Sequence, residues 1–139
     1  MTTTPKGIKN AGIIESIFGG WPSFHDAEIH GIVITRDCDS GALMDISIYH
    51  WQGTGEIAVT GHYVSIHHTL TTLRFVGVDD LEIVGFNRQN VIGDLEISEA
   101  AMPDSGFLVS LPSLYGCGAS FSCREIQVLS AIPFTKHEA

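Results

Sequence analysis

Histidine and acidic side chains lie close together in residues 21–30, WPSFHDAEIH, and could serve a metal ion or an acid–base reaction. A strand that begins inside this segment would place Asp26, Glu28 and His30 on one face. Because alternate residues of a strand are about 6.6 Å apart, Asp26 and His30 would be separated by about 13 Å. One ion with bonds of about 2.1 Å cannot collect all three from a straight strand. A metal site would therefore use two of them, with help from His50 on the next predicted strand.

The same segment also has a structural interpretation, which we favour. Trp21 and Phe24 would plug one end of the core, and Pro22 would stiffen the approach to the strand. A short polar side chain would cap free backbone N–H groups where the strand begins. We therefore predict structural roles for Trp21, Pro22, Phe24 and His25, and we predict no metal ligand in the chain.

Other sequence signatures of catalysis are missing. His62, His67 and His68 do not have the spacing of a zinc finger or of H-E-x-x-H. Residues 116–120, GCGAS, do not have the order of the G-x-S-x-G nucleophile elbow. Neither a P-loop nor a G-x-G-x-x-G pattern occurs. We therefore predict no catalytic residue, no cofactor and no enzymatic activity.

The charge balance limits the kind of partner. The 139 residues include 7 basic and 16 acidic side chains, which give a net charge of -9. Such a chain has no long-range attraction to phosphate backbones or to anionic lipid. We therefore predict that neither nucleic acid nor a membrane is its partner, and we favour a cationic one.

The length indicates one domain, residues 1–139, in which residues 1–10 form a polar N-terminal tail. No apolar run approaches the ~20 residues needed to cross a bilayer. The first ten residues, MTTTPKGIKN, have no apolar region and predict no secretory signal. The cysteines number 3, and an odd count is typical of free thiols in a reducing cytoplasm, where we expect the protein to act.

The elements that must position these side chains are mostly strands. One short helix is predicted over residues 11–18, where the apolar residues have helical spacing and two glycines follow. Runs rich in β-branched residues then alternate with glycine-containing turns. The predicted strands are Glu28–Arg36, Ala42–Trp51, Glu56–Val59, Tyr63–Val78, Leu81–Phe86, Val91–Ser98, Phe107–Leu111, Tyr115–Phe121 and Glu125–Ile132, with a loop at Gln52–Gly55 and turns at Asp37–Gly41, Asp79–Asp80, Asn87–Asn90 and Pro103–Gly106. This pattern predicts a mostly β fold: a single antiparallel sheet, strongly curved or doubled over, with one short N-terminal helix.

A set of short segments, in this order, carries a family pattern. They are Gly20–Glu28, His68–Phe75, Gly77–Leu81, Gly85–Asn87, Gln89–Val91, Tyr115–Phe121 and Cys123, and they span the chain from about Phe18 to Pro133. In combination they resemble the immunity protein 50 family of bacterial polymorphic toxin systems. The resemblance implies a small, mostly β protein that is encoded beside a toxin and protects its own cell by binding it. Such inhibition is stoichiometric, so the resemblance carries over no catalytic residue.

On this resemblance the partner is a cognate protein toxin. An acidic surface would speed the encounter with a basic toxin domain such as a nuclease. We expect acidic side chains to contact the toxin, namely Asp26, Glu28, Asp79, Asp80 and Glu82. Structural roles are expected for Asn87, Asn90, Tyr115 and Gly116. The sequence leaves open whether the chain is a monomer or a homodimer.

Two other classes of function stay open. A metal-dependent enzyme would use a subset of His25, Asp26, Glu28, His30 and His50. A small-molecule-binding β domain would need a large internal apolar pocket.

Overall fold

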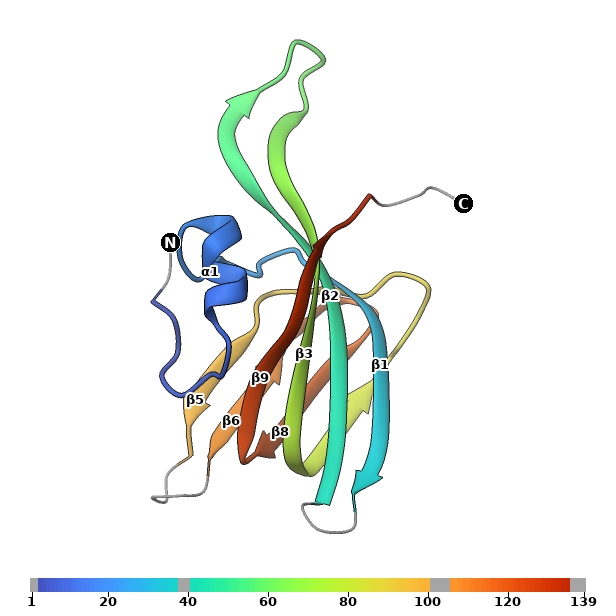
Figure 1. Ribbon diagram of the computed structural model, residues 1–139. Coiled ribbons are helices and arrows are strands. Elements are labelled where there is room, and N and C mark those ends of the chain that lie inside the picture. The colour runs from blue at the N-terminus through green and yellow to red at the C-terminus, as the bar shows by residue number, and fades with distance from the viewer. Residues whose placement is uncertain (1–2, 38–40, 101–105, 136–139) are drawn as a thin grey trace.

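The computed structural model describes residues 3–37, 41–100 and 106–135 (Figure 1). Residues 38–40 and 103–105, in two of the predicted turns, lie outside the described residues. The elements are α1 (Gly12–Phe18), β1 (Glu28–Asp37), β2 (Gly41–Ile57), β3 (Tyr63–Val84), β4 (Val91–Ile92), β5 (Glu96–Glu99), β6 (Phe107–Leu111), β7 (Ser113–Tyr115), β8 (Gly118–Cys123) and β9 (Glu125–Pro133). Helix α1 confirms the predicted helix and ends at Gly19, whose φ of 78° is a left-handed conformation that glycine adopts without strain.

The described strands form one antiparallel sheet that is not closed. Their order is β5-β6-β8-β3-β2-β1-β4-β7, and β9 pairs with β3 off this path. This arrangement confirms the predicted fold class of a mostly β chain with one sheet and one short helix. Within the described residues, no helix has the length and apolar character needed to cross a membrane.

The sheet doubles over at strand β3. Residues of β3 up to Val78 pair with β2, whereas Asp79 to Val84 pair with β8. The partner changes between Val78 and Asp79, next to Asp80, which has a φ of 52°, and the ladder with β8 shifts register between Asp79 and Glu82. The prediction of two strands separated by a turn was wrong here, because pairing with β8 continues β3 beyond the bend.

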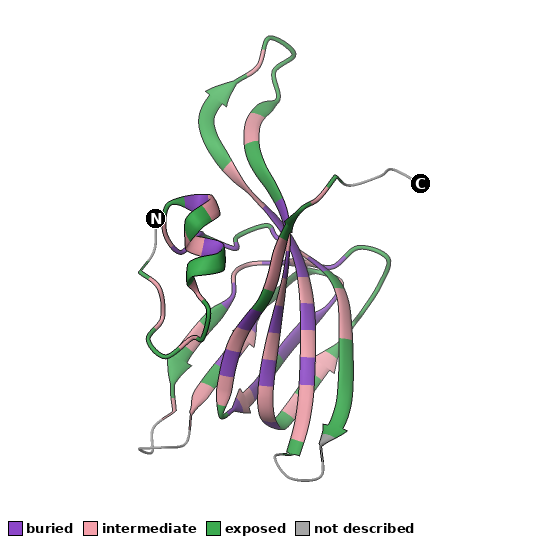
Figure 2. Cartoon of the chain, viewed as in Figure 1, coloured by how far each residue is buried: buried purple, intermediate pink, exposed green. Residues whose placement is uncertain are grey.

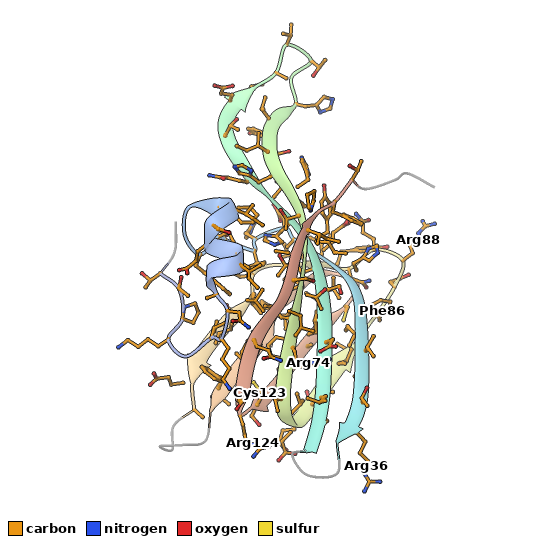
Figure 3. The ribbon with its side chains drawn as sticks, in the orientation of Figure 1. Arg36, Arg74, Phe86, Arg88, Cys123 and Arg124 are labelled. Carbon is orange, nitrogen blue, oxygen red and sulfur yellow. The ribbon has the colours of Figure 1, made fainter. Side chains whose placement is uncertain are left out.

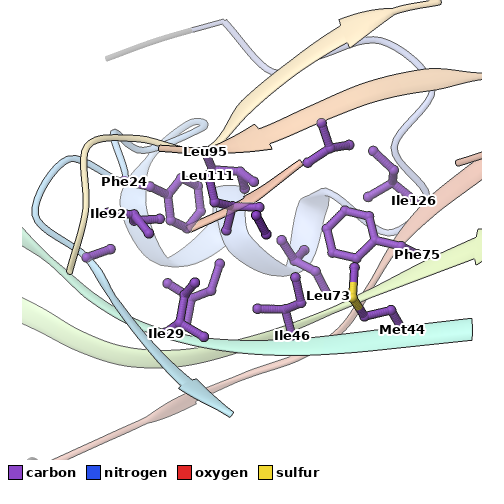
Figure 4. Close-up of a cluster of buried hydrophobic side chains, with 14 of the residues drawn as sticks. Phe24, Ile29, Met44, Ile46, Leu73, Phe75, Ile92, Leu95, Leu111 and Ile126 are labelled. Atoms are coloured by element: carbon purple, nitrogen blue, oxygen red, sulfur yellow. The ribbon is translucent and has the colours of Figure 1, made fainter. Parts of the chain in front are cut away.

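The core lies between the two halves of the bent sheet. Met44 of β2 and Phe75 of β3 lie on one side, with Leu111 of β6 on the other (Figure 4). Phe121 of β8 belongs to the same cluster. Phe75 and Phe121 pack edge to face with their ring centroids 4.9 Å apart. Helix α1 adds Ile14 to the same cluster. Figure 2 shows the buried residues concentrated along the middle of the strands.

The N-terminal segment before α1 runs beside β9. The Lys9 N–H donates to the Ile126 carbonyl at 2.9 Å, and the Val128 N–H donates to the Lys9 carbonyl at 2.9 Å. The Lys9 ammonium also lies 3.2 Å from the Glu125 carboxylate. Part of the segment predicted as a polar tail is therefore fastened to the outer edge of β9.

Strands β2 and β3 extend well beyond the rest of the sheet. The ladder between β1 and β2 ends at Glu28 opposite Tyr49, and β9 ends at Pro133 opposite Thr69. From there β2 and β3 continue as a two-stranded hairpin that projects from the body (Figure 1). We call residues 52–67 the arm. The predicted loop at residues 52–55 is part of β2, because two register shifts absorb its extra residues within the ladder.

Candidate partner-binding site

The aromatic residues of the WPSFHDAEIH segment lie in the core. Trp21 and Phe24 are buried with their ring centroids 5.7 Å apart, and Pro22 between them is buried as well. The Asp26 N–H donates to the carbonyl of Ile92 in β4 at 3.0 Å. These residues therefore fasten the segment to the core just before β1 begins.

His50 lies on the core face of β2 and is 1% exposed. Its ring stacks on Phe18 with centroids 4.9 Å apart and lies 4.6 Å from the ring of Phe24. Its Nε2 is 2.6 Å from the Thr71 hydroxyl, and its Nδ1 has no partner among the described residues. Burial lowers the pKa of His50 from 6.5 to about 4, so the ring is neutral at pH 7.

The residues of the metal alternative do not meet at one point. His50 faces the core between aromatic rings, while Nδ1 of the exposed His25 lies 3.2 Å from the Asp26 carboxylate. His30 packs against Phe134 near the C-terminal end, with ring centroids 5.2 Å apart. Within residues 3–37, 41–100 and 106–135, no group of three His, Cys, Asp or Glu side chains is arranged to hold an ion.

Asn90 joins the turn of residues 87–90 to two other parts of the chain. Its buried side-chain oxygen accepts bonds from the Asn87 N–H at 2.7 Å and from the Cys117 N–H at 3.0 Å. Its amide nitrogen donates to the Asn87 carbonyl at 2.8 Å. The Ile29 N–H of β1 donates to the Asn90 carbonyl at 2.8 Å. One amide thus holds the turn, β1 and the segment that precedes β8 in a fixed arrangement.

Gly116 makes this close approach possible. Its φ is 74°, and a Cβ there would collide with the carbonyl oxygen of Gln89 and lie 2.7 Å from the Asn90 side-chain oxygen. Only glycine combines that φ with that proximity. The preceding residue, Tyr115, pairs with Val91 of β4 but leaves its side chain exposed.

A groove of about 860 Å³ opens beside the same turn. Its lining comes from the start of β1, from β2, from the turn after β3 and from the segment after β9: Glu28, Ile29, His30, Tyr49, Phe86, Asn87, Arg88, Gln89, Asn90, Phe134 and Thr135. The Gln89 side-chain amide donates to the Glu28 carboxylate at 3.1 Å. Figure 3 shows Phe86 and Arg88 on the turn that borders this groove. The lining thus combines the exposed ring of Phe86 with a carboxylate and a guanidinium.

An aromatic cluster connects the groove to the base of the arm. Tyr49 lies 5.2 Å from Phe134 and 5.1 Å from Trp51 between ring centroids. The Tyr49 hydroxyl is 2.6 Å from Nδ1 of His68, and the Phe134 N–H donates to the His68 carbonyl at 3.0 Å. The segment after β9 is therefore held across the outer face of the sheet, where it forms one wall of the groove.

The acidic residues expected at an interface occupy two separate places. Glu28 is the first residue of β1 and lines the groove, and Asp26 lies two residues before it in the chain. Asp79, Asp80 and Glu82 lie at the bend of β3. Glu28 pairs with Tyr49 of β2, which pairs with Leu70 of β3. Leu70 and Asp79 are nine residues apart on β3, so the two places are separated by about 30 Å along the strand. The structure therefore places Glu28 in the groove with Asp26 nearby in the chain, and leaves the other three at the opposite end.

A family model described as Immunity protein 50 matches residues 10–134 of the 139-residue chain. The chain belongs to the immunity protein 50 family. The match runs from the residue before the α1 cap to the segment after β9, and so includes the groove and the arm. No curated protein and no solved structure was found to match the chain. The family name indicates an immunity protein.

Sequence reasoning missed two features of this immunity protein 50 chain, the groove and the arm. No sequence signal predicts the groove, since one of its walls exists only because Phe134 crosses the sheet to reach His30. The arm does have a signal: residues 52–67 contain a single charged side chain, Glu56, in a chain with 16 acidic and 7 basic residues.

Proposed function

We propose that this chain binds a cognate bacterial toxin in a one-to-one complex and blocks it by occupying its working surface. Membership of the immunity protein 50 family over residues 10–134 is the observation that carries the proposal. The chain acts as an inhibitor and contributes no catalytic step.

The toxin contacts one end of the molecule, where the groove lies together with Asp26 and Glu28. A stable interface covers about 800 Å² of each partner, which is a patch roughly 30 Å across. A patch centred on the groove therefore reaches the base of the arm but not the bend at Asp79. Exposed aromatic side chains such as Phe86 supply the kind of anchor that dominates interface energies.

A basic toxin domain, such as a nuclease, is the partner that the charge favours. The chain carries a net charge of -9, which would raise the association rate with a cationic partner at low ionic strength. Rising salt should then slow association far more than it speeds dissociation.

The test uses the toxin domain encoded next to the gene for this chain. Cells that express this domain should stop growing, and co-expression of the chain should restore growth. Titration of the purified domain with the chain should abolish toxin activity at a molar ratio of one. Complete inactivation of the toxin by far less than one equivalent of the chain would show that the chain turns over as an enzyme and is not a stoichiometric inhibitor. Failure to protect cells or to bind would refute the proposal.

A further inference from the structure

The arm presents apolar side chains to solvent, and none of the other described strands covers them. Val59 at its tip is fully exposed, Tyr63 is 83% exposed and Ile57 is 64% exposed. Figure 2 shows that most of this hairpin is exposed while the strands below it are partly buried. Exposed apolar side chains that gather on one projecting element are typical of an interaction surface.

The arm also has an ordered shape. The Thr54 hydroxyl donates to the Val64 carbonyl at 3.1 Å, which joins its two strands through a side chain. The Ala58 N–H donates to the His62 carbonyl at 2.7 Å and closes the tip. Because an isolated hairpin is only marginally stable in water, the arm keeps its shape through these two bonds and through its attachment to the body.

The base of the arm is held by the body of the protein. His68 has its Nδ1 2.6 Å from the Tyr49 hydroxyl and its Nε2 3.1 Å from the Ser65 hydroxyl. A hollow of about 230 Å³ lies where the arm residues Gln52 and Gly53 approach Ser23. From Gln52 at this base the strand runs about 17 Å to Ile57, at about 3.3 Å for each residue. The arm can therefore reach into a recess that the body cannot enter.

The charge of the chain indicates which kind of molecule binds the arm. The arm carries one charged side chain, Glu56, whereas the whole chain has a net charge of -9. A second copy would bring two strongly acidic bodies together, and an anionic membrane would repel the same charge. A cationic protein with an apolar recess fits both the nearly uncharged arm and the acidic body. The recess receives the arm, and basic residues at its rim face Asp26 and Glu28 near the base of the arm.

We propose that the β2–β3 arm is the inhibitory element, which inserts into an apolar recess of the toxin whose rim is cationic. This inference rests on the proposed function. Val59 and Tyr63 enter the recess, while Asp26 and Glu28 contact its rim. The arm thus determines the affinity for the toxin, and the acidic residues near its base raise the association rate.

The experiment compares two double variants of the full chain against the neighbouring toxin domain. Val59→Ser with Tyr63→Ser removes the apolar tip, and Val33→Ser with Leu108→Ser is the matched control at exposed positions of the body. The tip variant should raise Kd at least tenfold through a faster dissociation rate. The control should remain within twofold of the wild type, and both should keep the wild-type Tm.

Each outcome separates the two proposals. Wild-type binding with an unchanged Kd for the tip variant would refute the arm as inhibitory element and leave the proposed function standing. Lack of wild-type binding would refute the proposed function and the arm proposal with it. A wild-type dimer in sedimentation that the tip variant dissolves, with toxin affinity unchanged, would assign the arm to a second copy and overturn the proposal.

Discussion

Burial of His50 should make the fold less stable in mildly acidic solution. Its pKa is about 4 in the folded chain and 6.5 as the ordinary value, because burial disfavours the charged ring. Between these two pH values the unfolded chain binds a proton that the folded chain does not. The stabilising contribution is therefore complete above pH 6.5 and is lost as the pH falls to 4. A difference of about 2.5 pKa units corresponds to roughly 3 kcal/mol, a large share of the 5–15 kcal/mol of a typical domain.

Urea unfolding followed by tryptophan fluorescence at pH values from 7.5 to 4.5 measures this loss directly. The decisive comparison is with His50→Phe combined with Thr71→Val, which keeps an aromatic ring beside Phe18 and Phe24 and removes the hydroxyl that would lose its partner. Other groups titrate in the same range in both proteins, so the difference between their slopes isolates His50. We expect the wild type to lose about 2–3 kcal/mol more than the double variant over this pH range.

One result would refute this reasoning, namely a wild-type free energy of unfolding that changes with pH no more than that of the double variant. That result would mean that His50 accepts a proton in the folded chain without cost.

Three further predictions concern buried groups. Trp21→Ala should lower the free energy of unfolding by about 3–5 kcal/mol in urea titrations; an unchanged midpoint would contradict its burial. Asn90→Ala leaves two backbone N–H groups without their acceptor, so calorimetry should show a loss of about 2–5 kcal/mol, and a loss below 1 kcal/mol would show that water replaces the amide. Burial raises the pKa of Cys123 to about 12 and also raises that of Cys117. In a Cys38→Ser background, both thiols should therefore resist a disulfide reagent at pH 8 until urea unfolds the chain, and rapid labelling under native conditions would count against this.

Local patterns in the sequence predict most of the fold. Apolar spacing and the glycines after Phe18 predict α1, and alternation predicts β6 and the first part of β2. The predicted strand Tyr115–Phe121 is divided in the structure, where β7 ends at Tyr115 and β8 begins at Gly118. The bend in β3 could not be predicted, because the residue pair Asp79–Asp80 is equally typical of a turn between two strands. What decides the outcome is pairing with β8, a contact between residues some 40 positions apart.

The candidate site was less predictable than the fold. The asparagines of residues 87–90 are typical of a turn that satisfies its own backbone, and the bond from the Asn87 N–H to Asn90 agrees with that. The bond from Cys117 to the same oxygen joins distant segments and has no local signal. Ile57 and Val59 predict a strand in the arm. Whether neighbouring strands extend far enough to cover it is not encoded in these local residues.

The family motifs and the arm differ in what a substitution can change. Trp21, Asn90 and Gly116 make their contacts inside the molecule, so their loss should lower the free energy of unfolding. Val59 and Tyr63 point into solvent, so their loss should alter affinity and leave stability unchanged. Measurements of Kd and Tm on the same variants therefore distinguish the two roles. If Trp21→Phe remained fully folded yet lost affinity for the toxin, the WPSFHDAEIH segment would be a contact surface, and its structural interpretation would be wrong.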